Sequence, residues 1–273
     1  MNTLERKMVD TLKDLRENHH VVGVKAEFEA EGTRLEEALR LKEVITMAGL
    51  NLTLKIGGCE AIRDMYESRV IGVERVVAPM VESPFSLRKF LAATRLAFPK
   101  DEIEEIDFCV NIETIDACKA FDRMLEIPEI DQLDGIVMGR VDLTGSMGLK
   151  RDDINSPEIF KITKELFTKA KKKKKNFECA VGGGVSAHSL PFFRDLPKGL
   201  LDRYETRKVI FGCPAALSKD GDKGILKAVG FELMWLKNKR DYYSLISNED
   251  NQRIVMLEKR YKKMIEEAGG QVE

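Results

Sequence analysis

The sequence predicts an α/β fold, a closed barrel of parallel strands that alternate with helices, with extra helices at its C-terminal end. Seven short apolar segments alternate with amphipathic segments, and nearly every apolar segment ends in glycine, proline or a charged residue. Near-continuous apolar strands are typical of a parallel sheet buried on both faces. An open nucleotide-binding sheet is disfavoured because the chain has neither Gly-x-Gly-x-x-Gly after its first strand nor Gly-x-x-x-x-Gly-Lys. Polar residues at strand ends along the whole chain favour the barrel.

The elements follow from the spacing of apolar residues. Leu4, Met8, Leu12 and Leu15 predict an N-terminal amphipathic helix over residues 4–16. Strands are expected at residues 21–29, 52–56, 73–80, 106–112, 133–138, 177–181 and 208–211, and helices at 35–47, 60–68, 85–97, 115–125 and 157–172. Only seven strands are found, so the eighth is missed, replaced by the N-terminal helix or hidden in the C-terminal part.

The C-terminal residues fall outside the repeating pattern. Apolar residues at helical spacing predict one helix over 225–243 and a second over 251–268. We therefore expect a barrel over residues 1–224 and a helical extension over 225–273, which closes the barrel or contacts another subunit.

Composition excludes several classes of protein. The 273 residues are 43% hydrophobic, and 45 Lys+Arg against 46 Asp+Glu leave a formal net charge of −1. This balance gives no reason to expect nucleic acid or a membrane as partner, and no apolar run reaches the ~18 residues that span a bilayer. Five scattered cysteines and three histidines disfavour a zinc site. We expect a cytoplasmic protein with a small-molecule ligand.

Two carboxylates are the most informative residues. Glu113 and Asp142 lie at or just after the ends of consecutive predicted strands, so both are expected at one place. Buried carboxylates repel unless a cation or proton lies between them, and a hard divalent cation such as Mg²⁺ or Mn²⁺ suits two protein oxygens with open positions. The alternative is an exposed pair that caps helices.

The segments Val77–Ser83, Ile112–Thr114 and Leu133–Gly148 resemble the HpcH/HpaI aldolase and citrate lyase beta-subunit family, and the similarity covers residues 21 to 215. The resemblance implies a TIM barrel of the pyruvate/phosphoenolpyruvate type and a homo-oligomer. It also implies that Glu113 and Asp142 bind a metal that chelates a 2-oxo acid. Backbone amides near Gly139, Arg140 and Val141 would then hold the substrate carboxylate.

The chain departs from the family pattern at two places. Lys55 stands where the family has an arginine at a strand end, and lysine lacks the bidentate fork of arginine. Phe28 stands where aldolases of this group have a histidine base. Lys25, Glu27 and Glu29 alternate and point to one side of their strand. One of them is the base or a substrate contact, or they form a salt-bridged barrel end.

The glycine run 182–184 follows a late strand, where barrel loops commonly bind phosphate. Gly183, Ser186 and His188 are candidate contacts to phosphate or carboxylate, although the glycines also suit a tight turn. Arg207 precedes the last predicted strand and is expected in a structural ion pair. The lysine run 169–175 is interpreted as a solvated helix end.

These observations predict a metal-dependent carbon–carbon lyase of the class II aldolase type. It would act on a 2-oxo acid such as pyruvate through a metal-stabilised enolate, with an aldehyde or acyl acceptor. Lys55 would stabilise the enolate, and Glu27 or a metal-bound water would move the proton. Two alternatives stay open: a Schiff-base aldolase that uses Lys25 or Lys55, and a degraded barrel that only binds a ligand or partner.

Overall fold

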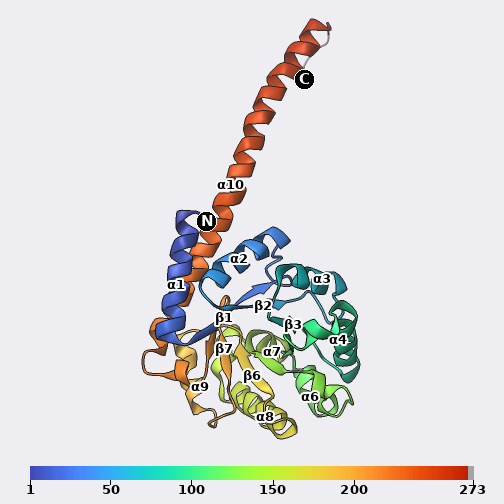
Figure 1. Ribbon diagram of the computed structural model, residues 1–273, viewed down its shortest axis with the longest axis vertical. Helices are drawn as coiled ribbons and strands as arrows, with labels where there is room; N and C mark the ends of the chain where they lie inside the picture. Colours follow the sequence, from blue (N-terminus) through green and yellow to red (C-terminus); the bar gives the residue numbers. More distant parts are fainter. Residues whose placement is uncertain (270–273) are drawn as a thin grey trace. The chain divides into compact units, whose positions relative to one another are not determined.

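The computed structural model describes residues 1–269 and contains a closed barrel of eight strands, which confirms the predicted fold class (Figure 1). The strands follow one another around the barrel in sequence order. They are β1 (Val21–Glu27), β2 (Asn51–Lys55), β3 (Arg75–Ala78), β4 (Asp107–Ile112), β5 (Gly135–Gly139), β6 (Glu178–Gly182), β7 (Arg203–Glu205) and β8 (Val209–Gly212).

Helices connect most of the strands and surround them (Figure 1). The α-helices are α1 (Thr3–His19), α2 (Leu35–Met47), α3 (Ile62–Ile71), α4 (Pro84–Ala97), α5 (Lys100–Ile103), α6 (Ile115–Leu125), α7 (Arg140–Ser146), α8 (Pro157–Lys173), α9 (Leu190–Asp195) and α10 (Gly221–Glu267). Short 3₁₀ helices lie at η1 (Ile130–Gln132), η2 (Arg151–Asn155), η3 (Ala187–Ser189) and η4 (Ala215–Leu217). The predicted helix starts have local causes: Ser83 and Ser156 cap α4 and α8, and each is followed by proline.

The last strand runs against the others. β1 to β7 are parallel, whereas β8 pairs antiparallel with both β7 and β1. The missing strand of the sequence analysis is β7, which has only three residues and joins β8 through a short connection instead of a helix. Because β8 is reversed, Lys208 before it lies at the same end of the barrel as Glu27 and Glu205. A pattern of strand–helix repeats does not predict this reversal.

The barrel interior is apolar in its middle and charged at its ends. Val77, Cys109, Val137 and Ala180, from four consecutive strands, form a buried cluster. At the beginnings of the strands, Arg75 forms ion pairs with Asp107 and Glu178. These charged groups lie at the end of the barrel opposite the candidate site residues, which follow the carboxyl ends of the strands.

The C-terminal part differs from the prediction of two helices. α10 is a single helix of 47 residues, because the polar stretch around Ser247 contains no proline or glycine that would end it. The chain forms two compact units, Met1–Glu232 and Leu233–Glu273, and residues 270–273 of the proposed extension lie outside the described residues. Within residues 1–269 no helix combines the length and apolarity needed to cross a membrane.

Candidate active site

Glu113 occupies the turn between β4 and α6, at the carboxyl end of the strand. β4 ends at Ile112, and Thr114 caps α6 by accepting a hydrogen bond from the Ala117 amide, so Glu113 is held between the strand and the helix cap. The Glu113 side chain is 1% exposed. Its carboxylate accepts hydrogen bonds from the Met80 amide at 3.0 Å and from the Asn111 side chain at 2.8 Å. Burial raises the pKa of this carboxyl group, and the negative charge of Asp142 acts in the same direction.

The neighbouring strand approaches Glu113 so closely that only glycine fits. A Cβ added to Gly139, at the end of β5, would lie 2.7 Å from Glu113 Cβ and closer still to its Oε2. Gly139 therefore allows the buried carboxylate to lie against the β5 backbone. This is a positional role for a residue that the sequence analysis assigned to substrate binding.

Asp142 is the third residue of α7, directly after β5, and it is exposed. No side-chain hydrogen bond or ion pair involves it among residues 1–269. Glu113 is thus buried and Asp142 is open to solvent, at the ends of neighbouring strands. The described residues contain no group of three or more His, Cys, Asp or Glu side chains placed to hold a metal. The two side chains offer carboxylate oxygens, the type of donor that hard divalent cations prefer.

Lys55 lies at the end of β2 and is 8% exposed. Its ammonium group is 3.0 Å from Glu29 Oε2 and 3.9 Å from Glu113 Oε2. Burial alone would lower the pKa of Lys55, but the carboxylates Glu113, Glu29 and Glu27 outweigh it, so the pKa is raised. Lys55 is therefore a fixed positive charge beside Glu113.

Lys25 and Glu27 of β1 form a buried ion-paired group with Glu205 of β7. Lys25 Nζ is 2.6 Å from Glu205 Oε1 and 3.0 Å from Glu27 Oε1. These carboxylates outweigh burial and raise the pKa of Lys25. Burial would raise the pKa of Glu27, but Lys25 outweighs it, so that pKa is lowered. The geometry matches the salt-bridged barrel end, the alternative that the alternating charges left open.

The sequence analysis missed Lys208, which is 2% exposed and forms an ion pair with Glu31. Burial lowers the pKa of Lys208, although Glu31 opposes this shift. Arg207 also pairs with Glu31, at 3.2 Å, as a structural ion pair. The signal in the sequence was weak, because a lysine before a strand would lie at the opposite end of an all-parallel barrel.

Arg140 is fully buried, and its guanidinium forms hydrogen bonds with oxygen atoms of the protein. It donates to the carbonyl oxygens of Gly182 at 3.2 Å and Gly183 at 3.1 Å, and to Asn155 Oδ1 at 2.6 Å. Its carbon atom Cζ lies 5.0 Å from the centre of the Phe193 ring. Burial lowers its pKa to about 10. The side chain thus ties the turn after β5 to the loop after β6, and only the backbone at Arg140 is left for a ligand.

The glycine loop lies against this turn. Gly183 has φ of 78°, and a Cβ there would lie 2.7 Å from the Val141 amide nitrogen. Gly183 and the Val141 amide, each a candidate substrate contact from the sequence, therefore lie close together. Ser186 is half-buried and precedes η3, whereas His188 within η3 is exposed. Neither side chain lines the pocket described next.

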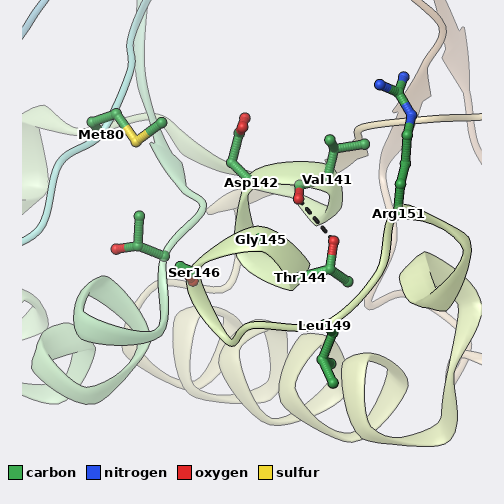
Figure 2. Close-up of a pocket in the computed structure, with 9 residues that line it drawn as sticks. Met80, Val141, Asp142, Thr144, Gly145, Ser146, Leu149 and Arg151 are labelled. Carbon is green, nitrogen blue, oxygen red and sulfur yellow. Dashed lines mark hydrogen bonds between the residues drawn. The ribbon is translucent and has the colours of Figure 1, made fainter.

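A pocket of about 530 Å³ lies beside Asp142 and is lined by Met80, Thr114, Val141, Asp142, Thr144, Gly145, Ser146, Leu149 and Arg151. Figure 2 shows the Asp142 and Arg151 side chains extended toward the same side, with Leu149 on the other. Thr144 is fixed at the pocket by the bond that its hydroxyl donates to the Val141 carbonyl at 2.7 Å (Figure 2). The pocket volume is typical of a small-molecule site.

Comparison with known proteins gives a consistent result. The family model described as "HpcH/HpaI aldolase/citrate lyase" matches residues 55–181. No curated protein matches the chain in sequence.

Solved structures share the fold at low sequence identity. An HpcH/HpaI aldolase/citrate lyase family protein from Burkholderia cenocepacia J2315 has a TM-score of 0.57 and 12% identity, over 90% of this chain and 100% of that one. Citrate synthase SbnG has a TM-score of 0.56 and 14% identity, over 86% of this chain and 90% of that one. Residues 55–181, which supply Lys55, Glu113 and Asp142, therefore match the HpcH/HpaI aldolase/citrate lyase family, a family of lyase-type enzymes, and the solved structures share the fold of the chain.

Proposed function

We propose that the chain is a divalent-metal-dependent carbon–carbon lyase of the class II aldolase type. Its substrate would be a 2-oxo acid such as pyruvate, joined to or released from an aldehyde or acyl acceptor. The observation that carries the proposal is the placement of two carboxylates, a buried Glu113 and an open Asp142, at the ends of neighbouring strands. These two residues would hold Mg²⁺ or Mn²⁺, which when bound supplies a Lewis acid to substrate oxygens.

Lys55 would stabilise negative charge on the substrate. Its raised pKa keeps it protonated at neutral pH, and Glu29 and Glu113 hold its ammonium group in place. A preorganised charge of this kind favours a transition state in which an oxyanion develops. The backbone around Arg140 and Val141 would receive the substrate carboxylate, with Arg140 holding the turn rigid.

The state of the lysines argues against the Schiff-base alternative. A lysine that attacks a carbonyl must lose its proton, which a lowered pKa favours. Lys25 and Lys55 both have raised pKa values, and each is paired with carboxylates. The metal-dependent route does not need a neutral amine.

Glu27 is still the proton-carrying candidate from the sequence, but its pairing makes it a weak base. The lowered pKa favours its ionised form and reduces its drive to accept a proton. A role in holding Lys25 is at least as well supported, because Lys25 Nζ lies between Glu27 and Glu205.

The test is cleavage of a 4-hydroxy-2-oxo acid, measured as pyruvate release with added Mg²⁺ or Mn²⁺ and again with chelator. We expect activity only with metal, and at least a hundredfold loss in Glu113→Gln and in Asp142→Asn. Calorimetry should show weaker Mn²⁺ binding in both variants. Asp116→Asn, which changes a carboxylate whose side chain is 76% exposed on α6, is the matched control. Full activity in chelator, or a borohydride-trapped lysine adduct, would contradict the proposal.

A further inference from the structure

The part of α10 beyond Glu232 carries a row of exposed apolar side chains. Leu233, Leu236, Ile254 and Leu257 are each 51% or 52% exposed. Leu233 and Ile254 are separated by three heptads, and so are Leu236 and Leu257, so all four lie on one stripe at a period of 3.5 residues. An apolar stripe of this period on a long helix is typical of a coiled-coil seam.

The middle of the same stripe is polar and decides how two such helices can pair. Its four central positions are Arg240, Tyr243, Ser247 and Asp250. In a parallel, in-register pair, Arg240 would face Arg240 and Asp250 would face Asp250, which places like charges in the seam. Like charges at such positions disfavour that arrangement.

In an antiparallel pair whose register is centred on the position of Leu245, each stripe residue faces the residue of the other helix that lies equally far from residue 245 on its other side. Arg240 then faces Asp250 of the other helix, in two symmetric layers. The apolar residues also match, since Leu233 faces Leu257 and Leu236 faces Ile254. Ile246, 45% exposed beside the stripe, lies close to the crossing point and would be covered there.

We propose that a second copy of this chain docks on this stripe, forming an antiparallel two-stranded coiled coil between the two α10 helices. Charge complementarity between Arg240 and Asp250 fixes the orientation, and the leucine and isoleucine layers supply the apolar burial. Arg240 forms an ion pair with Asp241 at 2.8 Å, in which the two side chains are 70% and 58% exposed. Such an exposed pair contributes little, so Arg240 is able to exchange it for Asp250 of the second copy.

The experiment measures self-association of the full chain by sedimentation equilibrium, with helix content followed by circular dichroism. In Arg240→Glu both polar layers become Glu opposite Asp, and we expect the dissociation constant of the α10-dependent step to rise at least about tenfold. The double variant Arg240→Glu/Asp250→Arg restores opposite charges and should associate like the unchanged chain. Lys259→Glu makes the same change of charge away from the stripe and is the control.

A parallel pair would respond differently, because Arg240→Glu only exchanges one like-charge layer for another. Association that is unchanged in Arg240→Glu, or not restored in the double variant, overturns the proposal. So does a full chain that stays monomeric at every concentration tested.

Discussion

Gly139→Ala tests whether the position of Glu113 controls activity. The added Cβ would lie 2.7 Å from Glu113 Cβ, and ordinary contact begins at 3.4 Å, so the two groups must separate by about 0.7 Å. A shift of that size would stretch the hydrogen bonds of 3.0 Å and 2.8 Å that hold the Glu113 carboxylate. Overpacking of this kind costs about 1–3 kcal/mol of unfolding free energy. Displacement of a catalytic group by about 1 Å costs about a hundredfold in rate.

Urea unfolding and pyruvate release by the same preparation would measure both effects. The matched control is Gly230→Ala in α10, where an added Cβ meets nothing within 4 Å. Alanine in a helix interior should leave activity unchanged and raise stability by up to about 1 kcal/mol. The reasoning is refuted if Gly139→Ala keeps its turnover within twofold and its unfolding free energy within about 0.5 kcal/mol.

Three further predictions concern buried groups. The ion pairs of Lys25 raise its pKa, so they stabilise the fold fully below about pH 10.5, the unfolded pKa of lysine, and this stabilisation is lost as pH rises through the higher folded pKa. Lys25→Met should lack this alkaline decline in urea unfolding. At pH 7 the variant should be about 3 kcal/mol less stable than the unchanged chain, because it leaves buried carboxylates without their partner. Arg140→Lys should lower the unfolding free energy by about 2 kcal/mol in the same assay, because lysine cannot make the several hydrogen bonds of the guanidinium. The control Arg151→Lys, at an exposed position, should change the unfolding free energy by less than about 0.5 kcal/mol. Equal effects of the two substitutions would show that the Arg140 side chain does not hold the two loops together. Burial raises the pKa of Cys109 to about 12, so iodoacetamide at pH 8 should label it only after unfolding, as followed by mass spectrometry; rapid labelling of the native protein would be inconsistent with its burial.

The sequence predicted the regular part of the fold because its signals are local. The apolar segments that end at Glu113 and Gly139 are strands in the structure, and Thr114 and Ser156 begin helices as capping residues do. It did not predict β7, because three residues beginning with Arg203 carry too little apolar pattern to register as a strand. The direction of β8 depends on the length of the connection between β7 and β8. The apolar pattern of β8 itself is the same for a parallel and an antiparallel strand, so it does not predict the reversal.

The sequence indicates which residues lie at the strand ends of the candidate site. It does not indicate which side chains contact residues far away in the chain. The positions of Glu113 and Asp142 directly after neighbouring strands could be read from the sequence, and both residues follow β4 and β5 in the structure. The commitment of the Arg140 guanidinium to backbone carbonyls was not visible in the sequence, because its partners Gly182 and Gly183 lie more than forty residues away. These long-range contacts show that the Arg140 side chain joins the turn after β5 to the loop after β6.

The reversal of β8 also explains why this end of the barrel holds so many charges. An all-parallel barrel would place Lys208 at the opposite end, but the hairpin from β7 to β8 brings it to the end that holds Lys25 and Glu27. Lys208 then forms an ion pair with Glu31, and its backbone carbonyl accepts a hydrogen bond from the Lys25 amide at 2.7 Å. Buried charges are costly unless they are paired, so each lysine at this end requires a carboxylate beside it. The alternation of Lys25, Glu27, Glu29 and Glu31 along one segment supplies these partners, and the same arrangement holds Lys55 next to Glu113.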